Sequence, residues 1–243
     1  MQGQPCLYCL GIGREPSVEH VAPVGLGSHV DIVLPRGAVC MECNTSLGRE
    51  VDEALVHLPE VQMIRGVHGL RNRNGRRLGE LDLRSGSLEF GPRGSVTIVA
   101  AEERVRWIDR RTISVTLELR RRRIKDQRRR AARSILKMGL AMLYLGRGPT
   151  VALSEEWHPA RRAIMGDLGV GYLLQGPYDV NRKPDFEASL RFNMPGAQAM
   201  AHLKFGGFSL MADLGLGVPN DRIRAWAREN GFSVITFEAG RAR

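Results

Sequence analysis

The sequence predicts an α+β fold in which a small N-terminal module precedes a mixed body of antiparallel strands and helices. Three observations predict it. The four cysteines of the 243-residue chain form two Cys-x2-Cys pairs within its first 43 positions. Short segments of alternating polarity, separated by glycine-rich turns, lie between about 60 and 119 and favour antiparallel strands. A longer segment from Arg128 repeats apolar residues at helical spacing until Gly146 and Gly148.

The cysteine pairs are separated by thirty residues, and no cysteine is left over. Each pair is typical of a tight turn that directs two sulfurs at one point, and two such turns supply the four-sulfur set that zinc favours. Four thiolates leave no open position for water or substrate, so the metal would be structural. The other interpretation is two unrelated pairs of buried thiols. We expect a structural Zn2+ bound by Cys6, Cys9, Cys40 and Cys43.

The segments between and after the cysteine pairs have distinct periodicities. Residues 17–21 and 32–34 are β-prone, and prolines flank the first of them. After Cys43, the run Asn44-Thr45-Ser46 is typical of a helix start, and apolar residues then recur at helical spacing as far as Leu58. The expected order is cysteine turn, strand, loop, strand, cysteine turn, helix.

This arrangement resembles a known family. The pattern Cys-x2-Cys, Glu19-His20-Val-x-Pro and Val-Cys-x2-Cys-Asn44-x3-Gly is similar to that of HNH endonucleases of the zinc-stapled ββα-metal type, over residues 4 to 58. His20 and Asn44 are twenty-four positions apart, close to the family's usual separation. The resemblance implies a treble-clef-like ββα-metal nuclease module over residues 1–59 and an α+β body over residues 60–243.

The resemblance also implies an activity, the metal-dependent hydrolysis of phosphodiester bonds in DNA. His20 would be the general base, a role that suits a neutral imidazole. Glu19 and Asn44 would hold a catalytic Mg2+ or Mn2+, since hard cations prefer oxygen ligands. Neighbouring side chains on a strand point to opposite faces, so Glu19 and His20 need a bend to reach one site. Asn44 is alternatively a helix-capping residue.

The sequence departs from the family pattern at Pro35, where the family commonly has an asparagine that orients the base. Orientation of His20 would then come from a backbone carbonyl or from Asp31. His29, between the two expected strands, is a candidate DNA contact. Asp52 and Glu53 are weaker candidates for a third metal ligand, against the alternative of an ordinary solvated helix face.

Positive charge is concentrated in one segment. The chain carries a formal charge of +10. Residues 104–133 contain thirteen basic and three acidic residues, so the net charge of this segment equals that of the whole chain. Such a segment indicates a polyanion-binding face, with DNA as partner, although a charge run is often only a solvated surface. The candidate nucleic-acid-binding residues are Arg120, Arg121, Arg122, Arg123, Lys125, Arg128, Arg129 and Arg130.

Other features limit the function classes. The N-terminus does not read as a secretory signal, and no run of about 18 apolar residues predicts a membrane span. We therefore expect a cytoplasmic protein without a membrane partner, and the lack of a glycine-rich nucleotide loop predicts no small-molecule cofactor. Residues 154–176 read as mostly helical, and the remainder as strands with a short helix opened by Pro219-Asn220. Two alternatives to the endonuclease stay open, a non-catalytic zinc-containing nucleic-acid-binding protein and a zinc-stabilised protein-binding module.

Overall fold

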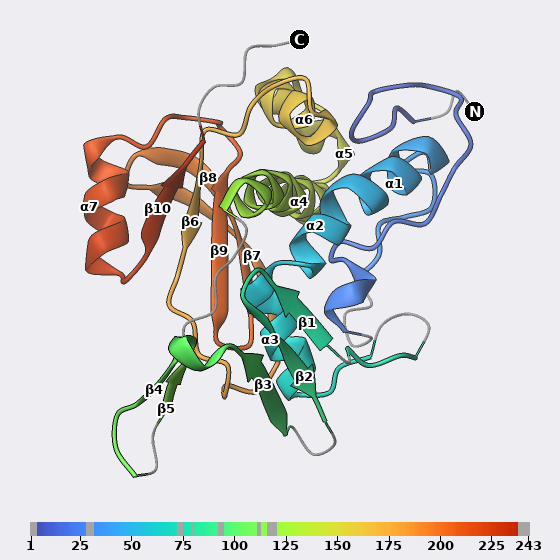
Figure 1. Cartoon of the computed structure of the whole chain (residues 1–243). Helices are drawn as coiled ribbons and strands as arrows, with labels where there is room; N and C mark the ends of the chain where they lie inside the picture. The colour runs from blue at the N-terminus through green and yellow to red at the C-terminus, as the bar shows by residue number, and fades with distance from the viewer. Residues whose placement is uncertain are drawn as a thin grey trace.

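The structure is a computed structural model of the whole chain, and it confirms the mixed α+β class with antiparallel sheets (Figure 1). It describes residues 4–27, 32–71, 75–78, 80–91, 95–110, 113–115 and 121–237. Within these residues no helix combines the length and the apolar character needed to cross a membrane.

The N-terminal part pairs its segments by isolated bridges rather than by long strands. Pro16 pairs with Cys40, and His20 pairs with Val33, both antiparallel. Proline has no N–H to donate to a ladder, so Pro16, Pro23 and Pro35 keep these pairings short. The helical elements that follow are η1 (Val24–Leu26), α1 (Met41–Leu47), the π-helical turn η2 (Gly48–Asp52), α2 (Glu53–Val56) and α3 (Pro59–Val67).

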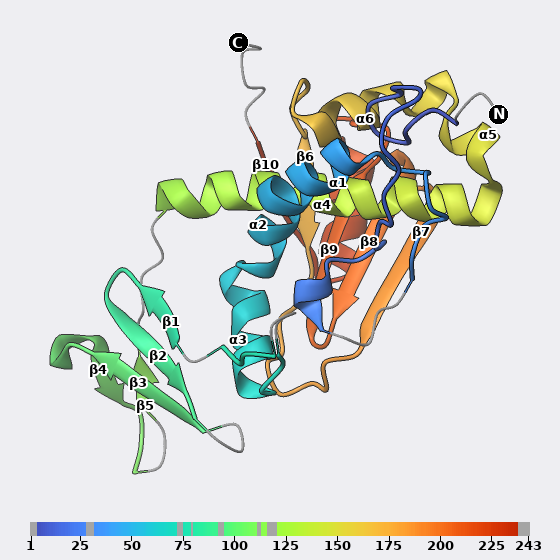
Figure 2. The ribbon, with the colours of Figure 1, turned by 90° about the vertical axis from the view of Figure 1, so that its right-hand side faces the viewer.

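The middle of the chain forms two small sheets that extend away from the rest of the molecule (Figure 2). The predicted hairpin around Ser85-Gly86 is present, and Gly86 has a φ of 150°, where an added Cβ would lie 2.1 Å from the Val99 carbonyl oxygen. The expected hairpin at Asn74 falls partly outside the described residues. The elements are β1 (Glu80–Leu83), β2 (Gly86–Phe90), β3 (Val96–Ala100), η4 (Glu102–Arg104), β4 (Val105–Trp107) and β5 (Ile113–Val115).

A long central helix, α4 (Arg121–Arg147), begins earlier than the apolar pattern from Arg128 predicts. Residues 154–176 are helical only in part, because Tyr172–Gln175 form strand β6 in the middle of a sheet. The five-stranded antiparallel sheet has the order β10-β6-β9-β8-β7. The remaining elements are α5 (Pro149–Ala152), η5 (Glu155–Trp157), α6 (His158–Met165), β7 (Phe186–Met194), β8 (Ala197–Phe205), β9 (Phe208–Asp213), α7 (Asp221–Glu229) and β10 (Ser233–Thr236).

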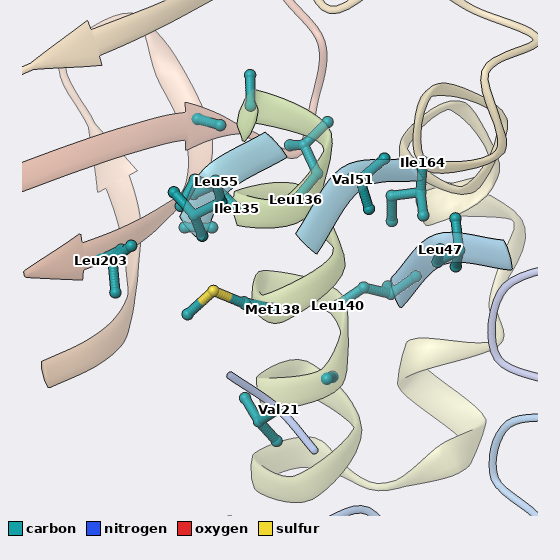
Figure 3. Close-up of a cluster of buried hydrophobic side chains, with 14 of the residues drawn as sticks. Val21, Leu47, Val51, Leu55, Ile135, Leu136, Met138, Leu140, Ile164 and Leu203 are labelled. Atoms are coloured by element: carbon teal, nitrogen blue, oxygen red, sulfur yellow. The ribbon is translucent and has the colours of Figure 1, made fainter. Parts of the chain in front are cut away.

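The large sheet is covered by α4 on one face and by α7 on the other (Figures 1 and 2). Gly139 lets α4 approach β8 closely, because a Cβ there would meet the Cβ of Ala201 at 2.5 Å. On its other side α4 packs against α2 and η2, and one buried cluster joins the cysteine module to the sheet. Figure 3 labels Val21, Leu47, Val51, Leu55, Ile135, Leu136, Met138, Leu140, Ile164 and Leu203 in this cluster.

The predicted boundary between residues 59 and 60 stays a prediction. Buried residues on both sides of it, such as Val51 and Ile135, belong to the same hydrophobic cluster. Residues of α4 therefore contribute to the core of the cysteine module.

Candidate metal centre and neighbouring ion-pair cluster

The four cysteines come together as the sequence predicts. Their sulfur atoms all lie within 4.8 Å of one another, and three of the four residues are buried. Cys6 and Cys9 come from the N-terminal turn, Cys40 caps the start of α1, and Cys43 lies in the first turn of that helix. The group is positioned to bind a metal ion.

The local geometry suits thiolate ligands. The backbone N–H of Gly11 donates to the Cys9 sulfur at 3.4 Å, and the N–H of Cys40 donates to the Cys6 sulfur at 3.4 Å. Metal–sulfur distances of about 2.3 Å at tetrahedral angles place sulfurs roughly 3.8 Å apart. The sulfurs of Cys9 and Cys40 are 3.9 Å apart, which fits that spacing.

The thiols are electrostatically coupled. A hydrogen bond from Cys43 to the Cys6 sulfur, supported by backbone N–H groups, lowers the pKa of Cys6 to about 4. The same hydrogen bond, together with burial, raises the pKa of Cys43, and burial raises the pKa of Cys40. Metal binding to the cysteines would release the protons that the thiols carry.

Asn44 connects the helix to the first extended segment. Its side-chain nitrogen donates to the Val18 carbonyl oxygen at 2.8 Å and lies 3.2 Å from the Ser17 hydroxyl oxygen. The N-cap position of α1 is held by Cys40 and not by Asn44. Asn44 therefore fixes the start of α1 beside the segment that carries His20.

His20 and Glu19 point in different directions. Residues 17, 19 and 21 are buried, whereas Val18 is exposed and His20 is half-buried. The segment up to His20 is extended, with hydrogen bonds from Val21 N to Ile32 O and from Leu34 N to Glu19 O, and the chain bends at Val21 and Ala22. The shared catalytic site of Glu19 and His20 stays a prediction.

Glu19 belongs to a buried ion-pair cluster that the sequence analysis does not foresee. The ammonium nitrogen of Lys137, on α4, lies 2.5 Å from a Glu19 carboxylate oxygen and 2.5 Å from an Asp52 carboxylate oxygen. Ser134, one turn earlier on α4, donates to the other Asp52 oxygen at 2.6 Å. Glu19 is 2% exposed and Lys137 is 1% exposed. The three charged side chains join the cysteine module to the central helix.

The charges in this cluster influence one another. Burial lowers the pKa of Lys137, but the carboxylates of Asp52 and Glu19 outweigh it and raise that pKa above its usual value. Burial raises the pKa of Glu19, and Lys137 opposes the shift. Tyr8 lies against the cluster, with its hydroxyl 3.5 Å from the Lys137 carbonyl oxygen, and its burial raises its pKa.

The expected Mg2+ or Mn2+ site does not fit this arrangement. A hard divalent cation needs several free oxygen ligands. The Glu19 carboxylate is buried against Lys137, so it is not free to bind a cation while this ion pair is in place. The roles of Glu19 and Asn44 as metal ligands stay predictions that require a rearranged Glu19.

The secondary candidates lie apart from one another. Asp52 is in the ion-pair cluster, and Glu53 lines a cleft on the other side of the helix start. His29 and Asp31 lie outside the described residues. Pro35 accepts a hydrogen bond from the N–H of Ala38 within the turn before Cys40.

The basic segment is partly used inside the protein. Arg120 lies outside the described residues, as do the side chains of Arg121, Arg122 and Arg123. Arg128 pairs with Glu60 at 2.7 Å, and Arg130 pairs with Asp126 at 3.0 Å. Lys125 is exposed and Arg129 is half-buried.

A cleft of about 520 Å3 lies along the basic part of α4. Helices α2 and α3 and the β1–β2 turn complete its walls. Its polar and charged lining residues are Arg49, Glu53, His57, Gln62, Asp82, Arg84, Gln127 and Arg130. Three arginines and two amides there are suitable donors to phosphate oxygens.

Sequence reasoning missed Lys137 and the cleft arginines Arg49 and Arg84. Lys137 had a usable signal, since it is the only charged residue within the otherwise apolar run from Ile135 to Leu145. A lysine buried by such a run needs an anionic partner. The arginines at 49 and 84 carry no signal of their own, because tertiary packing alone places them near α4.

Comparison of the chain with protein-family models, curated proteins and solved structures gave no significant match.

Proposed function

We propose that this chain is a zinc-containing protein that binds nucleic acid through the cleft beside α4. The observation that carries the proposal is the cleft itself, where Arg49, Arg84 and Arg130 meet beside the most basic segment of the chain. The net charge of +10 supports a polyanionic partner.

Zinc has a structural role in this proposal. The four-sulfur set is closed, so it offers no position for a reacting group. The metal would hold the first cysteine turn against the start of α1, and thereby fix η2, which carries Arg49, at the wall of the cleft. Metal binding and nucleic-acid binding are therefore expected to be coupled through the fold.

The arginines of the cleft differ in how available they are for phosphate. Arg130 pairs with the exposed Asp126, a contact that solvent weakens and that a phosphate can replace. Arg128, on the same helix but outside the lining of the cleft, pairs with the less exposed Glu60 and contributes less free charge. Arg49 is exposed at the mouth of the cleft. Arg49 and Arg130 are thus the best residues for a test.

The test is the salt dependence of binding to a short DNA duplex, measured by fluorescence anisotropy. Each phosphate contact contributes roughly 0.9 to the slope of log K against log salt, so Arg49→Ala combined with Arg130→Ala should reduce the slope by roughly 2. Arg222→Ala, with an exposed arginine on α7 beyond the large sheet, is the matched control. An equal decrease of the slope in the double variant and in Arg222→Ala would refute binding at the cleft. DNA binding that does not depend on salt would refute it as well.

A second candidate is a metal-dependent DNA endonuclease, with His20 as general base and a divalent cation at Glu19 and Asn44. It is favoured by the hydrogen bond from Asn44 to Val18, which fixes the helix start beside the segment that carries the half-buried His20. This candidate requires the Glu19 carboxylate to leave Lys137. The ion-pair cluster is the reason that we rank it second.

Nicking of supercoiled plasmid with Mg2+ or Mn2+ distinguishes the two candidates. Hydrolysis that is lost in His20→Ala and kept in His158→Ala, which alters an exposed histidine on α6, would establish the endonuclease. DNA binding without nicking in every variant is the result that our first proposal expects.

A further inference from the structure

In the ion-pair cluster of Glu19, Lys137 and Asp52, two carboxylates surround a positive charge as they would in a metal site. The positive charge here is the Lys137 ammonium group. Two carboxylates from separate segments approach one nitrogen at 2.5 Å each. The Ser134 hydroxyl completes the set by donating to Asp52. Glu19 comes from the extended segment, Asp52 from the π-helical turn η2, and Lys137 from α4.

Two carboxylates this close together need a positive charge between them, because like charges in a buried site repel strongly. In many proteins such a pair of oxygen donors holds a hard divalent cation. Here the Lys137 ammonium provides the charge and is itself 1% exposed.

The position of Lys137 is set by the whole fold. Gly139, two residues later on α4, lets this helix approach β8, while Ile135 and Leu136 bury the preceding turn. Tyr8 contacts the Lys137 carbonyl oxygen from the first cysteine turn. The ammonium is therefore held between the carboxylates by packing on both sides of α4.

We infer that the Lys137 ammonium takes the place of a divalent cation between Glu19 and Asp52, so that these carboxylates form a closed metal site that the loss of one side chain opens to Mn2+ or Mg2+. The inference does not depend on nucleic-acid binding. It predicts that the protein as it stands binds no divalent ion at Glu19, whatever its DNA partner.

The test uses Mn2+ as the probe, followed by electron paramagnetic resonance of zinc-loaded protein. The unaltered protein should leave added Mn2+ free. Lys137→Ala should bind a single Mn2+ at least about tenfold more tightly than the unaltered protein does, and adding Glu19→Gln to Lys137→Ala should abolish that gain. Zinc content and circular dichroism establish that each variant is folded.

Each outcome decides the inference. Mn2+ bound by the unaltered protein and lost in Glu19→Gln would overturn it and support the endonuclease instead. A folded Lys137→Ala that binds no Mn2+ would overturn it as well. If Lys137→Ala is unfolded, Mn2+ should restore its circular dichroism where sodium chloride of equal ionic strength does not, and failure of this rescue counts against the inference. A loss of DNA binding in the cleft variants leaves the inference untouched.

Discussion

The side-chain nitrogen of Asn44 lies 2.8 Å from the carbonyl oxygen of Val18, which ties the first turn of α1 to the extended segment before His20. The two residues are twenty-six positions apart in the chain. This contact joins two segments of the cysteine module without involving the cysteines. It gives Asn44 a structural role whether or not it also has a chemical one.

Replacing Asn44 by alanine should therefore destabilise the protein. A hydrogen bond of this type contributes about 1 kcal/mol to the free energy of unfolding. Alanine is also the better helix former, so Thr45→Ala, at the exposed neighbouring position, is the control for helix propensity. Urea unfolding should show Asn44→Ala about 1 kcal/mol less stable than Thr45→Ala. Equal stabilities would mean that the contact with Val18 contributes nothing.

The sequence predicts the elements whose signals are local. The cysteine turns, the hairpin at Gly86, the helix opened by Asn220 and the helix from Arg128 all follow from residues close in the chain. Strand β6 is missed because its first three residues, 172–174, form a short apolar run that is buried between β10 and β9 and lacks the alternation of a half-buried strand.

The candidate site is also predictable only where its signals are local. The metal-binding role of the cysteines follows from their spacing, which the sequence shows directly. The partner of Glu19 lies 118 positions away on α4, and only the packing of that helix against the module brings Lys137 to it. A sequence motif of neighbouring residues therefore singles out Glu19 as a candidate functional residue. It does not identify Lys137 as the partner of the Glu19 carboxylate.

Lys137 should be essential for stability. Lys137→Met keeps the length of the side chain and removes the charge, which leaves Glu19 and Asp52 without their common partner. Breaking a buried ion pair on one side costs about 3–5 kcal/mol. Urea unfolding at pH 7 should show a loss of this size, while Lys183→Met, at an exposed lysine, should stay within about 0.5 kcal/mol of the original protein.

The ion-pair cluster also makes stability depend on alkaline pH. The pKa of Lys137 is raised in the folded protein, so its contribution is complete below the usual lysine value of 10.5 and is lost as pH rises through the folded-state pKa. Unfolding free energies measured above pH 10 should fall more steeply for the original protein than for Lys137→Met. Parallel decreases would contradict a charged Lys137 in the fold.

Removal of metal should unfold the N-terminal module. The module has few long strand pairings of its own, and a structural zinc contributes on the order of 10 kcal/mol to the folding of such small units. A chelator should release a single zinc ion per chain and abolish amide-exchange protection in residues 4–27 and 32–47. Added zinc should restore both signals. Protection that survives complete loss of the metal would show that packing against α4 suffices.

His202 should make the protein sensitive to mild acid. The residue is 7% exposed on β8, with its ring nitrogens 2.6 Å from the Ser209 hydroxyl and 3.4 Å from the Ser189 hydroxyl. Burial, followed by the nearby Arg191, lowers the pKa of His202 from its usual 6.5 to about 4, while Glu187 opposes the shift and Lys204 reinforces it. The unfolded chain therefore binds this proton more readily than the folded protein does. Stability is complete above pH 6.5 and falls as the pH drops towards 4, by at most about 3 kcal/mol.

The unfolding free energy measured from pH 7 to pH 4 should show this loss, and His202→Gln should remove it. His158→Gln, at an exposed histidine, should leave the pH profile unchanged, and an unchanged profile in His202→Gln would mean that another group controls the acid response.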